Sequence, residues 1–317
     1  MFTRAPFLSR LMASSVKVSE SAGTLIKSIL AGGDLGVVEK GSSSAPDPQT
    51  EADRAAQYLI VNSLLGHFKA ITVIGEEEKT SVVPTLERGW SKEVVSAGLP
   101  SALEDMREED VVVWVDPLDG TSELARATDK SLATLQQVTV LIGIAHRGRV
   151  VGGVIHQPWH GDNGEGRTVW AIQGLGVHGL STAPAQAERV VVTTRSHSTP
   201  SVENALKELS DRGLSSRVER VGGAGFKVLK VLEGAAAYVF ASGGCKKWDT
   251  AAPQAILEAA GGQLTDISGR PLDYSAEVQK NNSGGVLATA PWVNHSEYLQ
   301  GIPGDLKDSL PEFHPRK

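Results

Sequence analysis

The chain has 317 residues, of which 40% are hydrophobic and 21% are charged, and its formal net charge is −6. This length exceeds what one hydrophobic core comfortably holds, so we expect two domains or one large α/β unit. The acidic balance argues against nucleic acid as a partner, because proteins that bind it present a basic face to its phosphates. No apolar run approaches the length of a membrane span, so we expect no membrane partner.

The single cysteine, Cys245, excludes an intrachain disulfide and favours a reducing, cytoplasmic setting. We interpret it as a small buried apolar side chain rather than a nucleophile. The N-terminal segment 1–19 is basic and free of acids, a composition also found in transit peptides. The spacing of Leu11, Val18, Ala22 and Leu25 instead favours an amphipathic helix that begins the fold.

The first half of the chain predicts two helices followed by a sheet. Apolar periodicity predicts helices over 8–31 and 51–68, separated by a polar, breaker-rich loop at 41–48. A mixed, charged segment at 79–109 predicts a partly helical insertion. The strands predicted from β-branched and apolar runs are 71–74, 111–115, 138–145, 150–155 and 168–172. A tight turn at 147–148 indicates a hairpin, so we expect an antiparallel sheet.

The second half of the chain has the alternating pattern of an α/β unit. The predicted helices are 201–211, 226–233 and 252–260, and the predicted strands are 190–193, 236–240 and 263–266. This alternation is typical of a sheet covered by helices. We therefore predict an α+β domain over 1–183 and an α/β domain over 184–317.

Acidic side chains follow the predicted strands where those strands end. Asp116 and Asp119 come after the strand 111–115, Glu76 follows 71–74, and Asp249 opens a helix. Buried unpaired carboxylates are costly, and four in one place would repel one another. Two divalent cations would neutralise them, and oxygen ligands select magnesium, manganese or calcium rather than zinc.

The segment 116–121, with the sequence Asp-Pro-Leu-Asp-Gly-Thr, is open to two interpretations. A turn there would aim both carboxylates and the Leu118 carbonyl at one point. Taken alone, Asp-Pro and Asp-Gly are common turn dipeptides, and acids at helix starts are common caps. The haloacid-dehalogenase phosphatases carry Asp-x-Asp-Gly-Thr, but here Asp116 and Asp119 are three apart, which argues against that class.

Three motifs in order resemble the lithium-sensitive, magnesium-dependent phosphatases. They are Gly-Glu-Glu at 75–77, Trp-Val-Asp-Pro-Leu-Asp-Gly-Thr at 114–121, and Trp-Asp-Thr-Ala-Ala-Pro at 248–253. That family includes inositol monophosphatase, fructose-1,6-bisphosphatase, inositol polyphosphate 1-phosphatase and the bisphosphate nucleotidases, and the resemblance runs over about 8–290. It implies a layered αβαβα sandwich of the sugar-phosphatase type, with an antiparallel sheet first and a smaller mixed sheet second.

The resemblance also implies site residues. The ligands it implies for two or more magnesium ions, with inhibition by lithium, are Glu76, Asp116, the Leu118 carbonyl, Asp119 and Asp249. It further implies that Asp47 accepts the hydroxyl proton of Thr121, which orients and deprotonates the attacking water. Paired metals suit this chemistry because they hold the charge that develops during phosphoryl transfer.

A closer resemblance is to the bisphosphate nucleotidase branch of the family. The segments that carry it are 33–40, 47–53, 193–198, 221–227 and 244–249. It implies removal of the 3′-phosphate from adenosine 3′,5′-bisphosphate, with action on 3′-phosphoadenylyl sulfate and inositol 1,4-bisphosphate. The implied substrate contacts are Thr194, His197, Gly223 and Lys227. Without the resemblance, His197 would be a surface loop residue and the glycines near 223 a tight turn.

The chain departs from that branch beside the predicted site. Ser122 stands where lysine is expected, the segment 123–137 is longer and more polar, and Pro48 replaces leucine. Specificity is therefore open, and the alternatives are inositol polyphosphate 1-phosphatase or inositol monophosphatase activity, or a non-catalytic nucleotide-binding relative. Of oligomeric states we favour the monomer.

Overall fold

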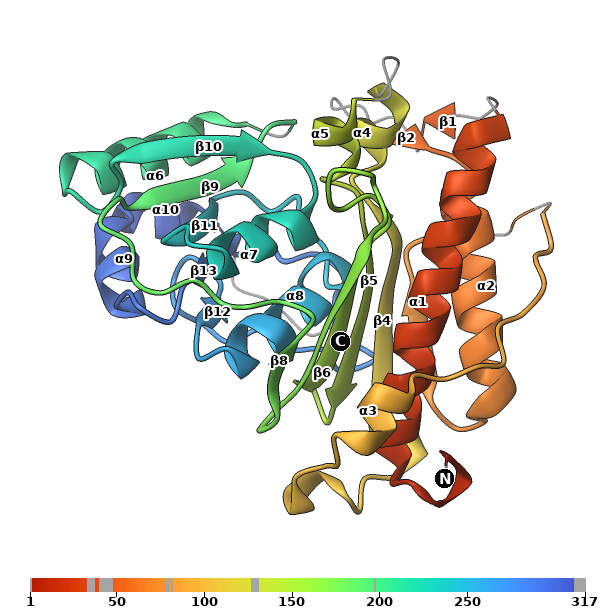
Figure 1. Cartoon of the computed structure of the whole chain (residues 1–317). Coiled ribbons are helices and arrows are strands. Elements are labelled where there is room, and N and C mark those ends of the chain that lie inside the picture. Colours follow the sequence, from red (N-terminus) through yellow and green to blue (C-terminus); the bar gives the residue numbers. More distant parts are fainter. Residues whose placement is uncertain are drawn as a thin grey trace.

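The computed structural model describes residues 2–32, 38–39, 48–77, 80, 82–126, 131–196 and 198–310. Five layers of helices and sheets follow one another across the molecule (Figure 1). This arrangement is the predicted αβαβα sandwich. The first layer holds α1 (Phe7–Gly32) and α2 (Glu51–His67), and the third holds α7 (Ala224–Leu232) and α8 (Trp248–Ala259). The fifth holds α6 (Pro200–Asp211), α9 (His295–Gly301) and α10 (Gly304–Ser309).

The helices of the first layer bury the faces that their periodicity predicts. Leu11, Val18 and Ala22 of α1 are buried. The apolar residues of α2 that are buried are Ala52, Ala55, Ala56, Leu59, Ile60 and Leu64. A capping box begins α2, because the Thr50 side chain accepts from the Asp53 backbone and the Asp53 side chain accepts from the Thr50 backbone. The two helices pack against each other and against one face of the first sheet.

The first sheet has six strands in the order β3-β4-β5-β6-β7-β8. They are β3 (Thr72–Gly75), β4 (Val111–Asp119), β5 (Thr139–His146), β6 (Arg149–Gln157), β7 (Arg167–Ile172) and β8 (Gly176–His178). The predicted hairpin is β5–β6, whose turn uses positive φ at Arg147 and Gly148. The sheet is antiparallel as predicted except that β3 and β4 run parallel.

The predicted turn after Val115 is a bulge in a continuing strand. β4 extends to Asp119, with Asp116 opposite Leu141 and Asp119 opposite Thr139. Between these two pairs β4 has two residues, 117 and 118, whereas β5 has one, 140. The register of the two strands therefore shifts at this point, as in a β-bulge. The bulge, rather than a turn, changes the facing of the two carboxylates.

The second sheet is smaller and mixed, as predicted, with the order β10-β9-β11-β13-β12. Its strands are β9 (Val190–Thr194), β10 (Arg217–Val221), β11 (Ala237–Phe240), β12 (Gln263–Thr265) and β13 (Val286–Thr289). The first three in sequence are parallel, and β13 is antiparallel to both of its neighbours. Strands β10 and β13 were not predicted.

Short elements complete the described chain. They are β1 (Val38–Glu39), β2 (Pro48–Gln49), α3 (Lys92–Ser96), α4 (Thr121–Arg126) and α5 (Leu132–Leu135), with 3₁₀ turns at Phe2–Arg4, Ser101–Leu103 and Glu108–Asp110. The segment 79–109 is thus partly helical where it is described. The predicted loop at 41–48 lies outside the described residues except for Pro48.

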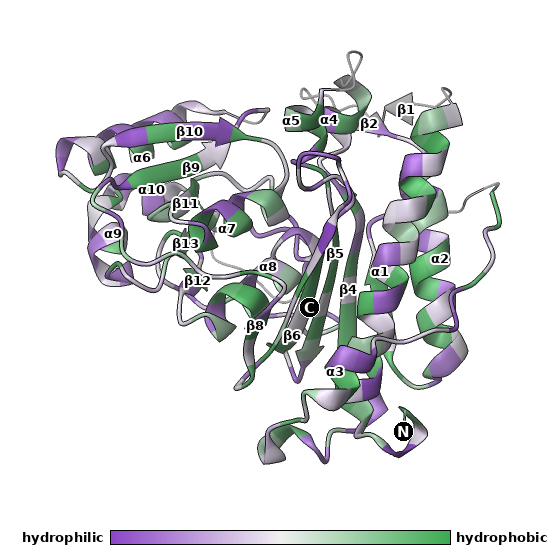
Figure 2. Cartoon of the chain, viewed as in Figure 1, coloured by the Kyte–Doolittle hydropathy of each residue, from purple (hydrophilic) through white to green (hydrophobic). Residues whose placement is uncertain are grey.

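Two apolar clusters fill the space on either face of the six-stranded sheet. One lies under α1 and α2, and the other joins the opposite face to α8 and the second sheet. Figure 2 shows the hydrophobic colouring concentrated on the central strands. The change of sheet falls between β8 and β9, near the predicted boundary at 183. Because one cluster includes residues of both sheets, the division into two domains stays a prediction. Among the described residues, no helix is both long and apolar enough to span a membrane.

Candidate active site

A cavity of about 160 Å³ lies between the first sheet and the loops of the second half. The predicted site residues that line it are Glu76, Asp116, Leu118, Asp119, Thr121, Thr194, Gly223, Lys227 and Asp249. The other two, Asp47 and His197, lie outside the described residues. The structure therefore brings together all the predicted site residues that it describes, while the roles assigned to them stay predictions.

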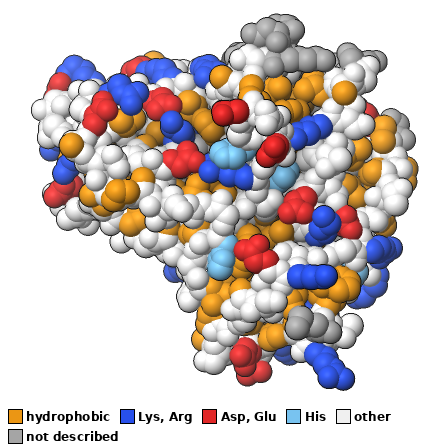
Figure 3. Space-filling model, viewed as in Figure 1, with side chains coloured by type: hydrophobic (Ala, Val, Ile, Leu, Met, Phe, Trp, Pro, Cys, Tyr) orange, Lys and Arg blue, Asp and Glu red, His pale blue; other side chains and the backbone are white. Residues whose placement is uncertain are grey.

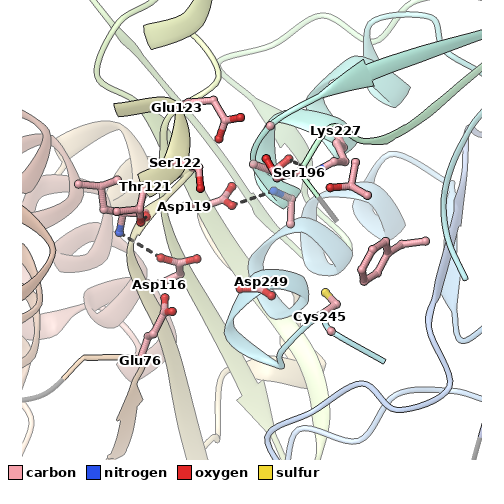
Figure 4. A pocket seen from close by; sticks show the side chains of 18 of the residues that line it. Glu76, Asp116, Asp119, Thr121, Ser122, Glu123, Ser196, Lys227, Cys245 and Asp249 are labelled. Atoms are coloured by element: carbon pink, nitrogen blue, oxygen red, sulfur yellow. Dashed lines mark hydrogen bonds between the residues drawn. The ribbon is translucent and has the colours of Figure 1, made fainter. Parts of the chain in front are cut away.

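Three acids face the same space from three different elements (Figure 4). Glu76 follows β3, Asp116 lies on β4 and Asp249 is in the first turn of α8. Burial raises the pKa of Asp116 well above its usual value, and Glu76, Asp119 and Asp249 raise it further. Burial and the charge of Glu76 raise the pKa of Asp249 to about 7, although the Lys246 N–H donates to its carboxylate at 2.7 Å. The cluster thus carries more negative charge than its surroundings compensate.

The fourth acid, Asp119, is held by the N-terminus of α7. The Ala224 N–H donates to Oδ1 and the Gly225 N–H to Oδ2, both at 2.8 Å. The Thr139 hydroxyl donates to Oδ2 at 2.7 Å. These amides are the kind that bind anions at helix N-termini, and here a carboxylate of the protein occupies them. The contact fixes α7 against the first sheet.

Among the described residues, the acid that accepts a hydrogen bond from the Thr121 hydroxyl is Asp53. The Thr121 Oγ1 lies 2.9 Å from the Asp53 Oδ1 and 3.0 Å from the Leu118 carbonyl oxygen. The other oxygen of Asp53 accepts from the Thr50 N–H at 2.8 Å, and the carboxylate is buried. The role predicted for Asp47 stays a prediction, because Asp47 lies outside the described residues. Asp53 was not predicted, because the capping box of α2 accounts for an acid at that position without a second role.

The glycine segment before α7 allows a close approach to the acids. Gly223 has a φ of +61°, and a Cβ there would lie 2.6 Å from the Gln137 carbonyl oxygen and 2.9 Å from the Asp119 Oδ2. A Cβ on Gly225 would lie 2.6 Å from the Thr139 Oγ1. The segment is therefore more than a tight turn: only glycine permits this contact.

Lys227 lines the opposite wall of the cavity, and Arg195 lies near it. The Lys227 ammonium donates to the Gly223 carbonyl at 2.9 Å, and burial lowers its pKa while Asp119 and Glu123 oppose the shift. Glu123 is itself buried, and burial raises its pKa while Lys227 and Arg195 oppose the shift. The Arg195 guanidinium lies 3.9 Å from the Glu123 carboxylate. Glu123 comes from the segment where the sequence departs from its apparent relatives, and it lines the cavity with Ser122.

The carboxylate oxygens of the cavity are ligands of the kind that magnesium prefers. The acids supply hard oxygen ligands, and their raised pKa values show an excess of negative charge that divalent cations would neutralise. In the part of the chain that the structure describes, no three acidic, histidine or cysteine side chains converge closely enough to hold an ion as they stand. Since Asp119 faces α7, its side chain would have to turn to join such a site. Cys245 is buried beside the cluster, and burial raises its pKa, which agrees with its interpretation as an unreactive side chain.

The fold and its acidic cavity define the class of layered phosphatases of the sugar-phosphatase type. The model of the inositol monophosphatase family matches residues 8–303, and this chain belongs to that family. The proteins named 3′(2′),5′-bisphosphate nucleotidase 1 of Rattus norvegicus and Homo sapiens are each 44% identical to it, over 96% of this chain and 97% of theirs. The protein of the same name from Dictyostelium discoideum is 32% identical over 91% of this chain and 94% of its own.

Solved structures agree with the fold. The extragenic suppressor protein SuhB from Bartonella henselae superposes with a TM-score of 0.65 at 22% identity, over 92% of this chain and 98% of its own. CysQ from Bacteroides thetaiotaomicron superposes with a TM-score of 0.64 at 24% identity, over 90% of this chain and 98% of its own. The predicted fold class is thereby confirmed.

Proposed function

We propose that this chain hydrolyses the 3′-phosphate of adenosine 3′,5′-bisphosphate to AMP and phosphate. The observation that carries the proposal is the 44% identity, over nearly the whole of both chains, to proteins named 3′(2′),5′-bisphosphate nucleotidase 1. The acidic cavity supports it, because carboxylates, the Thr121 hydroxyl and a lysine line one space. 3′-Phosphoadenylyl sulfate and inositol 1,4-bisphosphate, which share a phosphate ester beside a second anionic group, are proposed as further substrates.

We propose that Asp53, rather than Asp47, receives the proton of Thr121. The Thr121 hydroxyl donates toward Asp53, so its oxygen keeps lone pairs that can accept a hydrogen bond from an attacking water. Asp53 is held by α2 and buried, so it can hold Thr121 in one orientation. The pair thus orients the water and takes up its proton.

The residues proposed to hold magnesium are Glu76, Asp116, the Leu118 carbonyl, Asp119 and Asp249. When bound, such ions lower the pKa of a coordinated water and stabilise developing charge, and lithium is expected to compete with them. Lys227 and Gly223, which line the opposite wall, are proposed to contact the phosphate or sugar of the substrate. Thr194 lines the same wall, at the end of β9.

The proposal is tested by phosphate release from the purified chain. Adenosine 3′,5′-bisphosphate should be hydrolysed with magnesium and not with a chelator, and inositol 1-phosphate should be a poorer substrate by kcat/KM. The Thr121→Val variant should lower kcat roughly 10²- to 10⁴-fold, and Thr121→Ser, which keeps the hydroxyl, should lower it far less. Preference for inositol 1-phosphate would favour the inositol monophosphatase alternative, and no turnover of either substrate would leave the proposed activity without support.

A further inference from the structure

The segment at which the sequence departs from its apparent relatives contacts the glycine loop of the second half. Residues 122–126 and 131–137 of that segment are described, and they contain α4 and α5. Gln137 follows α5, and its side-chain oxygen accepts from the Gly222 N–H at 2.7 Å. Its side-chain nitrogen donates to the Ala133 carbonyl at 3.1 Å, which fixes the orientation of the amide. Gln137 is 7% exposed, so this contact is shielded from water.

A second residue of the same segment meets the same glycine. The Glu123 carboxylate packs so closely on Gly222 that a Cβ at that position would overlap it. In Figure 4 the Glu123 side chain extends from α4 toward the wall that carries Lys227. Gly222 is therefore held from one side by an acceptor and from another by a carboxylate, both supplied by the departing segment.

The conformation of Gly222 directs the chain into α7. It is separated from α7 by Gly223 alone, and a glycine pair has little intrinsic conformational preference. The Gly223 carbonyl holds the Lys227 ammonium, and the next two amides hold Asp119. A buried N–H must find a partner, so loss of the Gln137 acceptor would let Gly222 rotate and would move these groups.

We infer that Gln137 is a positioning residue that fixes Gly222, Gly223 and the first turn of α7, and with them the wall of the cavity that carries Lys227, against the first sheet. The inference rests on the proposed function where it concerns substrate affinity. Three of the predicted cation ligands, Glu76, Asp116 and Asp249, lie on elements that Gly222 does not continue into. The fourth acid, Asp119, would have to turn away from the α7 amides to bind a cation, so that conformation does not depend on them. Gln137 therefore acts on substrate affinity more than on cation affinity.

The test compares Gln137→Met, which keeps the side-chain length and loses the acceptor, with Gln136→Met at the neighbouring position. The Gln136 backbone, not its side chain, accepts from Gln157, so the control leaves that bond intact. For Gln137→Met, KM for adenosine 3′,5′-bisphosphate should rise roughly tenfold, since a buried donor loses its partner. Manganese affinity, measured by titration calorimetry, should change by less than about threefold.

Hydrogen exchange provides a readout without substrate. Peptides that cover 218–228 should exchange faster in Gln137→Met than in the wild type or in Gln136→Met, because the Gly222 amide loses its acceptor. Gln137→Glu keeps an acceptor oxygen for the Gly222 N–H but loses the donor to the Ala133 carbonyl, so it should restore part of the protection. Unchanged exchange in Gln137→Met, or faster exchange with an unchanged KM, would overturn the inference, as would an equal effect of the two methionine variants. If the wild type does not hydrolyse the bisphosphate, the proposed function fails, and the exchange comparison decides the role of Gln137 by itself.

Discussion

The acid cluster should make the cation-free protein less stable as the pH rises. The pKa of Asp249 is raised from 3.8 to about 7 in the folded chain, chiefly by burial and then by Glu76. A carboxyl whose pKa is higher in the folded state keeps its proton there to a higher pH than in the unfolded chain. Its contribution to the free energy of unfolding is therefore complete below about pH 4 and is lost by about pH 7. At 1.36 kcal/mol per pKa unit, the loss from Asp249 is about 4 kcal/mol.

The Asp249→Asn variant removes this loss, because asparagine does not ionise. Its side-chain oxygen can still accept from the Lys246 N–H, as the carboxylate does at 2.7 Å. The new amide NH₂ needs a partner in the half-buried cavity, which costs up to about 1–3 kcal/mol. In chelator at about pH 8, the free energy of unfolding of the variant should therefore exceed that of the wild type by about 2 kcal/mol. The same variant should lack magnesium-dependent activity.

A matched control is Asp266→Asn, at the end of another strand. Asp266 is also buried, but it accepts from the Ser268 and Arg270 backbones and pairs with the Arg270 guanidinium. Removal of its charge should lower the free energy of unfolding by about 1–3 kcal/mol. The two substitutions, identical in chemistry, should thus change stability in opposite directions.

Urea unfolding followed by tryptophan fluorescence measures these differences. In chelator, the excess in free energy of unfolding of Asp249→Asn over the wild type should grow from about pH 5 to about pH 8, and this comparison cancels the opposite contribution of His156, whose pKa burial lowers to about 4. Magnesium should restore most of the stability that the wild type loses, because the ionised cluster binds it best at the higher pH. The pKa of Asp116 is raised in the same direction and adds to the slope. A difference between Asp249→Asn and the wild type that does not grow over this range in chelator, or a loss of stability in Asp249→Asn equal to that in Asp266→Asn, would refute the reasoning.

Two further pairs of substitutions test the partner of Thr121 and the packing of α8 on the first sheet. Asp53→Asn should lower kcat roughly 10²- to 10³-fold, and Asp47→Asn should lower it much less, if Asp53 holds the Thr121 hydroxyl; steady-state kinetics in which Asp47→Asn is the more damaging would return the role to Asp47. Gly143→Ala should lower the free energy of unfolding by about 2–3 kcal/mol, since its Cβ would lie 2.6 Å from a backbone nitrogen of α8. The control Gly32→Ala, whose Cβ would have no atom within 4 Å, should change the free energy of unfolding by under about 0.5 kcal/mol. Equal values for the two variants in urea titrations would contradict the packing argument.

The sequence predicts the elements whose periodicity is strong and local. Helices α1 and α2 follow their apolar stripes to within a residue or two at each end. Strand β10 was not predicted, because Val218 and Val221 lie among charged residues. An edge strand of such mixed polarity resembles a loop in the sequence. The bulge in β4 was predicted as a turn, since Pro117 suggests a break, while the pairing with β5 that continues the strand lies far along the chain.

The candidate site also combines residues that the sequence predicts with contacts that it does not predict. Acids at strand ends are visible in the sequence because they follow apolar runs directly. The contact between Thr121 and Asp53 joins residues 68 apart, and that between Gly222 and Gln137 joins residues 85 apart. No local pattern marks such a pair, and each member has a sufficient local explanation: a helix cap, a turn, or a polar loop residue. The distribution of charge over the surface also depends on the fold. On the face shown in Figure 3, acidic and basic side chains are mixed, and no large patch of one sign forms among the described residues.

The need for a cation differs among the acids according to the donors that each one meets. Asp119 accepts from two amides and a hydroxyl, so much of its charge is met by the protein. Asp116 accepts from the Leu118 N–H at 3.0 Å while three other acids raise its pKa. Asp249 accepts from the Lys246 amide and is half-buried in the cavity, where burial and then Glu76 raise its pKa. The uncompensated charge is therefore greatest at Asp116 and Asp249, between β4 and α8, and a bound cation would stabilise the fold there as well as serve the reaction.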